Sequence, residues 1–264
     1  MKLLYIGDIM ADLGIQTVEQ ILPDLVTTLQ IDFVVAQAEN VTDGRGITPA
    51  DMLRLQACGV HAFTGGNWSL YRPEITSAMN DPEQPIVRPA NYPSGTPGLG
   101  YKYIKTASGK VLVISLLGQI VGRDADKPVD NPLRVIDSIL DHEAQTTRAA
   151  TVVNFHGDFS SEKVIIGHYL DGRVTMVVGD HWHVPTADAR VLPGGTAHMS
   201  DVGMCGALDA SLGVAYSSVV ARWRDGIQSR NVMETLGQRQ FNALLVETDA
   251  TGLALSAEHI RRLV

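Results

Sequence analysis

The chain has 264 residues, of which 45% are apolar and 19% are charged, and its formal net charge is −8. This composition excludes a disordered chain, and it leaves no basic field that could hold a nucleic-acid backbone, so no stable nucleic-acid complex is expected. Cys58 and Cys205 are the only cysteines, too few for a disulfide scaffold, which favours a reducing, cytoplasmic compartment. The N-terminal apolar run is too short for a signal peptide, and no stretch reaches the roughly 18 apolar residues of a membrane span, so no membrane partner is expected.

In the first half of the chain, short apolar runs alternate with amphipathic stretches, a pattern typical of α/β layering. Apolar residues spaced three and four apart predict a helix over about 15–29. A second helix is predicted to begin with Thr48 as N-cap and Pro49 at its first position, and Asn131 opens a third that runs to about residue 147. The apolar runs predict buried strands at Lys2–Ile6, Phe33–Val35, Val60–Phe63 and Val111–Leu117.

The second half repeats this alternation. A helix is predicted over 160–170, and alternating apolar and polar residues at Asn242–Glu247 and again at Leu253 and Leu255 predict a terminal hairpin. Strands are predicted at Thr151–Phe155, Val174–Val178, 189–192 and 196–199. Because no repeat or linker interrupts the chain, we expect one α/β domain over residues 1–264.

Side chains that bind metal ions follow the predicted strands. They are Asp8, Glu39, Asn40, Asn67, His156, His181 and His183. In layered α/β folds the strand ends line one crevice, so these residues can converge there. Carboxylate, amide and imidazole donors suit a pair of Mn, Fe or Zn ions, and the absence of cysteine ligands argues against a structural zinc site.

Each of these residues also has a simpler interpretation when it is taken alone. Asp8 is typical of a turn or cap after a strand, and His156 of a hydrogen-bonded core histidine. His181 and His183 carry more weight, because residues two apart on an extended segment point the same way. Only the joint placement at successive strand ends favours a metal centre.

At this point the sequence resembles a known family, the bacterial YmdB-like proteins of the calcineurin-like metallophosphoesterase superfamily, described as 2′,3′-cyclic-nucleotide 2′-phosphodiesterases. The motifs that carry the resemblance span nearly the whole chain in order: YIGDIM, AENVTDGRGIT, TGGN, RPANYPSGTPGLGY, NFHGDFSSEK, YLDGRV, VVGDHWHVPTAD, VLPGGTAHMSDVGMCG and FNALLVET. The resemblance implies a metallophosphoesterase-type αβ-sandwich of two mixed sheets flanked by helices.

The resemblance also implies which residues hold the metals. Asp8, Asn40 and His183 would hold a first divalent ion. Asn67, His156 and His181 would hold a second, and Glu39 would bridge the two. Iron and manganese are the favoured metals and zinc an alternative. A hydroxide shared by two such cations would attack phosphorus while the cations neutralise the phosphoryl oxygens.

Two positions depart from the family pattern. The family has a histidine, assigned to protonate the leaving oxygen, where this chain has Trp68. Indole supplies no acid near neutral pH, and loss of a general acid typically costs on the order of 10²–10⁴ in rate, so no catalytic residue is assigned. Trp68 is either a packing aromatic or a stacking surface for a nucleobase. Asn154 stands where relatives usually carry aspartate, which would alter the support of His156.

The Pro- and Gly-rich segment RPANYPSGTPGLGY predicts an ordered loop. Together with Trp68, Arg88 and Asn91 from this loop are predicted to contact the phosphate or base of a substrate. The alternative is that the loop only buttresses the crevice or an oligomer contact.

Three functional interpretations follow. The first is a dinuclear phosphodiesterase that hydrolyses cyclic nucleotides or similar small phosphoesters. The second is a catalytically weakened, metal-containing relative that acts as a phospho-ligand sensor or interaction protein, and the third is a metal-free scaffold. The sequence leaves the oligomeric state open, with a symmetric homo-oligomer as the alternative to a monomer.

Overall fold

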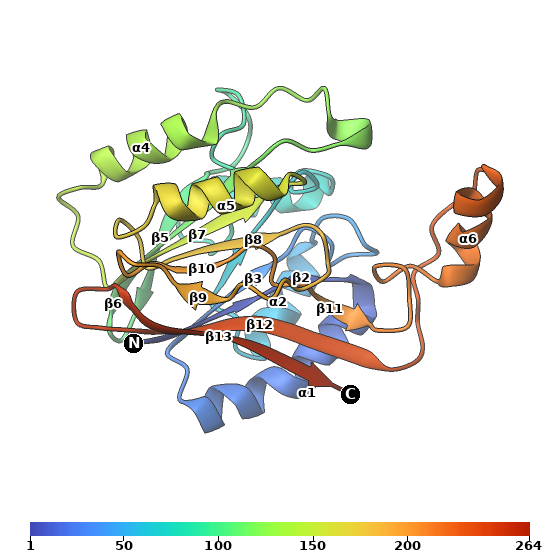
Figure 1. Ribbon diagram of the computed structural model, residues 1–264, viewed down its shortest axis with the longest axis horizontal. Coiled ribbons are helices and arrows are strands. Elements are labelled where there is room, and N and C mark those ends of the chain that lie inside the picture. Colours follow the sequence, from blue (N-terminus) through green and yellow to red (C-terminus); the bar gives the residue numbers. More distant parts are fainter.

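Two mixed β-sheets lie face to face in the computed structural model, which describes residues 1–264 apart from the side chain of residue 123 (Figure 1). The first sheet has the order β2-β11-β12-β1-β3-β4, with β13 paired to β12. Its strands are β1 Lys2–Ile6, β2 Asp8–Ile9, β3 Phe33–Gln37, β4 Ala62–Thr64, β11 Met204–Ala207, β12 Arg239–Thr248 and β13 Ala254–Leu263.

The second sheet has the order β5-β6-β7-β8-β10-β9. Its strands are β5 Tyr101–Thr106, β6 Gly109–Leu117, β7 Ala150–His156, β8 Met176–Asp180, β9 Arg190–Val191 and β10 Ala197–Met199. The α-helices are α1 Ala11–Leu29, α2 Pro49–Ala57, α3 Thr76–Asn80, α4 Pro132–His142, α5 Ser160–Tyr169 and α6 Tyr216–Asp225, and 3₁₀ turns lie at η1 Pro73–Ile75 and η2 Gly122–Asp124.

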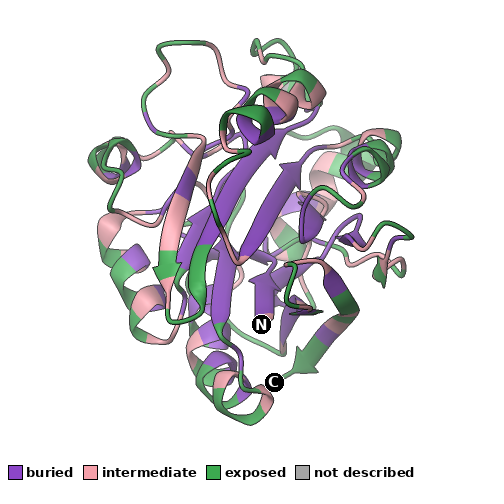
Figure 2. Ribbon diagram, turned by 90° about the vertical axis from the view of Figure 1, so that its left-hand side faces the viewer, coloured by how far each residue is buried: buried purple, intermediate pink, exposed green. Residues whose placement is uncertain are grey.

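Helices and sheets form four layers. One apolar cluster joins α1 and α2 to the outer face of the first sheet, and another joins α4 and α5 to the outer face of the second. Between the sheets, a third cluster packs residues such as Tyr5 and Val35 of the first sheet against Val152 and Val178 of the second. Figure 2 shows the strands as the buried interior and the helices as the partly exposed outer layers. The predicted αβ-sandwich of two mixed sheets flanked by helices is confirmed.

Local sequence explains how these elements begin. The side chain of Thr48 caps α2 by accepting a hydrogen bond from the backbone N–H of Asp51, and Pro49 occupies the first helical position. Asn131 caps α4 in the same way, accepting from two backbone N–H groups. The strands β3, β7 and β8 are buried along their whole length, which explains why each reads as a continuous apolar run.

Some sequence predictions were wrong. The helix α4 ends at His142 rather than near residue 147, because its last core residues are Ile139 and Leu140 and the only apolar side chain of the next turn, Ala144, is exposed. Five strands and α-helices were not predicted: β2, β5, β11, α3 and α6. The terminal hairpin was predicted, but β12 proves to be an interior strand, with β13 along one edge and β1 and β11 along the other.

The parallel strands bring their carboxyl ends to one region. In the first sheet β1, β3 and β4 are parallel, and in the second sheet β7 and β8 are parallel. The segments that follow these strands carry the predicted metal ligands. Among the described residues, no helix combines the length and the apolar character needed to cross a bilayer.

Candidate metal centre

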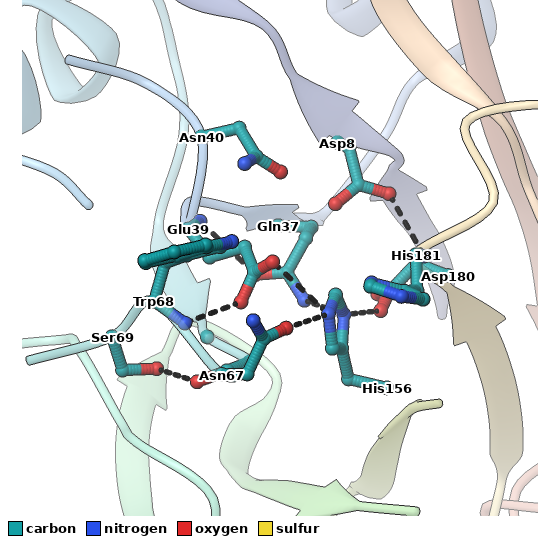
Figure 3. A network of polar contacts seen from close by, with 12 residues as sticks. Asp8, Gln37, Glu39, Asn40, Asn67, Trp68, Ser69, His156, Asp180 and His181 are labelled. Carbon is teal, nitrogen blue, oxygen red and sulfur yellow. Dashed lines mark hydrogen bonds and ion pairs between the residues drawn. The ribbon is translucent and has the colours of Figure 1, made fainter. Parts of the chain in front are cut away.

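His156, the last residue of β7, lies at the middle of the candidate site (Figure 3). Its Nε2 atom lies 3.0 Å from Glu39 Oε1 and 3.0 Å from Asn67 Oδ1. Its ring centroid lies 4.4 Å from that of His181. Two oxygen donors and two imidazoles from four separate segments therefore meet within one buried space.

A second group of donors lies beside the first. Asp8, at the start of β2, accepts a hydrogen bond from the backbone N–H of His181 at 3.2 Å, and its Oδ1 atom lies 3.8 Å from His183 Nε2. Asn40 follows β3 and lies across from Asp8 in Figure 3. The structure thus brings together the side chains that the sequence placed at separate strand ends.

Three buried polar atoms in this second group lack a hydrogen-bond partner among the described residues. They are Asp8 Oδ1, Asn40 Oδ1 and His183 Nδ1. A buried polar atom without a partner costs roughly 1–3 kcal/mol, so native structures rarely contain one without a reason. All three belong to the residues that the family resemblance assigns to a single ion, and a bound cation would satisfy the two oxygens directly.

Three carboxyl groups, those of Asp8, Glu39 and Asp180, are buried close to His156. Burial, together with the Asp180 carboxylate, raises the pKa of Asp8 well above its usual value. Burial works against the charged form of His156, but the Glu39 and Asp180 carboxylates outweigh it and raise the pKa of His156 well above its usual value. A proton on His156 therefore offsets these carboxylates, a role that metal cations can take over.

The other two histidines are held neutral. Burial, together with the charge on His156, lowers the pKa of His181 to about 4. Burial and the neighbouring His181 lower the pKa of His183 to about 4. Neutral imidazole is the form that binds metal ions, so both rings are ready as ligands at neutral pH.

Asp180, the last residue of β8, orients His156. Its Oδ1 atom lies 2.6 Å from His156 Nδ1, and its Oδ2 atom accepts hydrogen bonds from Tyr5, at 2.7 Å, and from Asn154. Metal-binding histidines commonly use their second nitrogen in this way. Asn154 therefore supports His156 through Asp180, as an outer residue and not as a ligand.

Sequence reasoning missed Asp180, although a carboxylate that ends a buried strand just before a histidine pair is a usable signal. It also missed Asp158, whose Oδ1 atom lies 3.1 Å from His181 Nε2. The prediction that His181 and His183 lie on an extended segment was wrong. Both have positive φ, 104° and 62°, so the chain bends sharply there, and the two rings reach different groups of ligands.

A buried ion pair supports this bend. The ammonium of Lys163 on α5 donates to the Asp180 carbonyl and, at 2.8 Å, to the Asp201 carboxylate, and both side chains are fully buried. The same carboxylate accepts the backbone N–H of Trp182 at 2.9 Å, and Lys163 Nζ lies 4.1 Å from the Trp182 ring centroid. Lys163 and Asp201 thus fix the segment that carries both histidines.

Trp68, at the position of the family's proton donor, lies at the rim of the site. Its backbone N–H donates to Glu39 Oε2 at 3.1 Å. The guanidinium of Arg45 lies 4.6 Å from the indole centroid, and Tyr71 contacts the ring edge-on at 5.4 Å. The indole is partly exposed, and no general acid takes the histidine's place among these neighbours.

Arg88 and Asn91 hold the backbone of their own loop and its neighbours. The Arg88 guanidinium donates to the carbonyls of Pro89, Thr96 and Pro97. Asn91 donates to the Leu117 carbonyl at 2.7 Å and accepts from the backbone N–H of the same residue. These contacts give both side chains a structural role, and substrate contact by either stays a prediction.

The donor set fits divalent metal ions. Glu39, His156 and His181 place one ligand atom each within 4.8 Å of one another. Carboxylate, amide oxygen and neutral imidazole are the donors that Mn, Fe and Zn accept, and the unpartnered atoms mark where a cation would be held.

Known proteins resemble the chain over almost its whole length. A Bacillus subtilis protein named 2′,3′-cyclic-nucleotide 2′-phosphodiesterase is 34% identical over 261 residues, which are 98% of this chain and 96% of that protein. A solved structure of a hypothetical protein from Thermus thermophilus has a TM-score of 0.90 at 31% identity, covering 100% of this chain and 99% of that one.

A solved Mycoplasma pneumoniae structure described as a novel phosphatase also has a TM-score of 0.90, at 27% identity, covering 100% of this chain and 93% of that one. Its fold agrees with the metallophosphoesterase-type sandwich expected from the sequence. A family model described as YmdB-like protein matches residues 4–260. The chain therefore belongs to the YmdB-like protein family.

Proposed function

We propose that this protein is a metal-dependent phosphodiesterase that hydrolyses 2′,3′-cyclic nucleotides or similar small phosphoesters. The observation that carries the proposal is the set of unpartnered buried atoms on Asp8, Asn40 and His183, next to the cluster around His156. The name of the B. subtilis relative supports the substrate class.

We propose a centre of two divalent ions, iron or manganese in preference to zinc. Asp8, Asn40 and His183 would hold one ion, Asn67, His156 and His181 the other, and Glu39 both. When bound, such a pair lowers the pKa of a shared water and neutralises phosphoryl oxygens. The chain's own contribution is to place and orient these donors, with Asp180 holding the His156 ring and the Trp68 N–H holding Glu39.

The proposal is tested by turnover of metal-loaded protein. Protein purified without chelator is analysed for metal and then assayed with 2′,3′-cyclic AMP and bis(p-nitrophenyl) phosphate in the presence of Mn²⁺ or Fe²⁺. We expect hydrolysis, and we expect it to disappear in Glu39→Gln and His156→Ala variants that remain folded. Protein that contains metal but hydrolyses neither ester with either ion would refute the proposal, and protein that binds no metal would support a metal-free scaffold.

Trp68 favours a second candidate function, a catalytically weakened relative that binds a phosphorylated ligand as a sensor or interaction protein. The proposed ligand set is complete in the sequence, but the residue that the family resemblance assigns to protonate the leaving group is replaced by an indole. Such a protein would bind metal and phosphoester but turn over slowly.

A Trp68→His variant separates the two functions. If the centre lacks only its acid, the substitution raises kcat by on the order of 10²–10⁴, measured against Trp68→Phe as a control that keeps an aromatic ring but adds no acid. A wild-type rate that Trp68→His does not increase would show that the missing acid is unimportant and would remove the case for a sensor.

The expected partners follow from this chemistry. A net charge of −8 favours a small phosphoester over a nucleic-acid polymer. We propose a cytoplasmic enzyme, and a symmetric homo-oligomer is the assembly to test by light scattering.

A further inference from the structure

A pocket of about 460 Å³ opens beside the candidate metal centre. Its lining residues are Asn67, Trp68, Leu70, Tyr71, Tyr92, Pro93, Thr96, Lys127 and Pro128. Binding sites for small organic ligands are typically about 300–1,000 Å³ and mostly apolar, with a few polar groups. This pocket falls in that size range, and its lining combines aromatic and aliphatic side chains with a few polar ones.

Three aromatic side chains dominate the wall, and their positions are fixed. The Tyr92 hydroxyl donates to the Gly66 carbonyl at 3.1 Å. Trp68 is held at its backbone by Glu39 and at its ring edge by Tyr71. Side chains held in this way lose little conformational freedom when a flat ligand stacks on them.

The indole of Trp68 is also held by a cation. Arg45 lies over its ring at 4.6 Å, yet Arg45 does not line the pocket, so part of the indole remains free to the pocket. Lys127 Nζ, which does line it, lies 5.8 Å from the same ring. Because Lys127 Nζ also pairs with Asp124, the pocket offers mainly aromatic surface, which suits stacking of a flat ring.

The pocket and the metal centre share a wall. Asn67 lines the pocket, and its Oδ1 atom lies 3.0 Å from His156 Nε2. Its amide donates to Asp124 at 2.8 Å, and Asp124 pairs with Lys127 at 2.8 Å. A molecule with its phosphate at the centre could therefore place an attached ring in the pocket.

We infer that this pocket binds the nucleobase of the substrate and that the base stacks on Trp68. Stacking on an aromatic side chain accepts any base, because every base has a π-face. The replacement of the family histidine would then exchange a proton donor for a base-binding surface. This inference rests on the proposed phosphodiesterase function, but base binding can be measured without turnover.

Binding is tested first, with adenosine and ribose as probes, by isothermal titration of the metal-loaded protein. We expect adenosine to bind and ribose not to bind. Trp68→Leu should weaken adenosine binding about tenfold or more, whereas Trp68→Phe should retain most of it. Trp223→Leu, at an 84% exposed position on α6, is the matched control and should leave binding unchanged.

Turnover is tested second, with 2′,3′-cyclic AMP and with methyl riboside 2′,3′-cyclic phosphate, in which a methoxy group replaces the base. Trp68→Leu should lower kcat/KM about tenfold or more for the nucleotide and leave the base-free ester unchanged. Equal losses for both esters, or adenosine binding that Trp68→Leu does not weaken, would overturn the inference. Adenosine binding that depends on Trp68, in protein that hydrolyses neither ester, would support the pocket and refute the proposed function.

Discussion

Asp180 decides how His156 meets the candidate metals, because it fixes the ring through the nitrogen that faces away from Glu39 and Asn67. The carboxylate is fully buried, yet the hydrogen bond and charge of His156 outweigh the effect of burial and keep its pKa below the usual value. An ionised Asp180 in turn raises the basicity of the ring that it holds.

An Asp180→Asn substitution should therefore weaken metal binding about 10–100-fold. Tyr5 and Asn154 both donate to Oδ2, so an amide that keeps its oxygen at that position presents its N–H group, in place of Oδ1, to His156 Nδ1. Titration of the metal-free protein with Mn²⁺ measures the effect. Asp137→Asn, which removes an exposed partner of Arg173, is the control, and equal affinities in the two variants would contradict the orienting role.

The sequence was enough to predict the proposed ligands, but not the residues that orient them. Asp8, Glu39 and His156 were predictable because each follows or ends a recognisable buried strand, and parallel strands bring such ends together. The partners Asp158 and Asp180 depend on distances between loops that no sequence pattern encodes. The pocket could not be predicted for the same reason, because Trp68, Tyr92 and Lys127 belong to three loops whose relative positions the sequence does not show.

Among the structural elements, the bend after β8 stores strain that the surrounding structure must balance. His181 and His183 both have left-handed backbone angles, which cost roughly 1–3 kcal/mol each in a residue other than glycine. The hydrogen bonds that Lys163 and Asp201 make to the backbone of this segment hold it in place. Two of the proposed metal ligands, His181 and His183, are therefore held in place by α5, an element that supplies none of the proposed ligands.

A Lys163→Met substitution should destabilise the fold by about 3–5 kcal/mol, because it leaves the Asp201 carboxylate buried without its cation. Urea unfolding of metal-free protein measures the loss. Lys163→Met combined with Asp201→Asn should recover part of it. Arg54→Met, which removes ion pairs of a partly exposed guanidinium, should cost about 0–1 kcal/mol, and a similar cost for Lys163→Met would contradict the stabilising role of the buried ion pair.

Elements were predictable where one physical signal dominated. Helix α1 was predicted from its apolar spacing, and the starts of α2 and α4 from their caps. Strands β3, β6 and β7 were predicted from their continuous apolar runs. Strand β11 was missed because it is only four residues long and contains glycine, and β5 because its YKYIKT sequence is only partly buried. The helix α6 has a single buried residue, Val219, so it has almost no apolar face to detect.

For the whole molecule, metal binding should act as a link between the two sheets. Asp8, Glu39 and Asn67 follow strands of the first sheet, while His156, His181 and His183 end or follow strands of the second. A cation held by both groups binds only when the sheets are packed together, so it stabilises the folded state by mass action.

Mn²⁺ or Fe²⁺ at 100 times its dissociation constant should therefore raise the free energy of unfolding by about 2.7 kcal/mol. For a chain of this size the increase corresponds to roughly 5–10 °C in Tm. Differential scanning calorimetry with and without EDTA measures the shift, and His156→Ala should lose most of it. An unchanged Tm in wild-type protein with Mn²⁺, Fe²⁺ and Zn²⁺ would argue against any metal centre.

The place of β12 inside the first sheet has a consequence for biosynthesis. Residues 239–248 pair with β13 along one edge and with β1 and β11 along the other, so the sheet that carries Asp8 lacks the strand that joins β1 to β11 until these residues have been translated. A nascent chain that ends before residue 239 would contain all the proposed ligands and still lack the strand that completes the sheet around Asp8. We therefore expect stable binding of the proposed metals to follow the synthesis of β12.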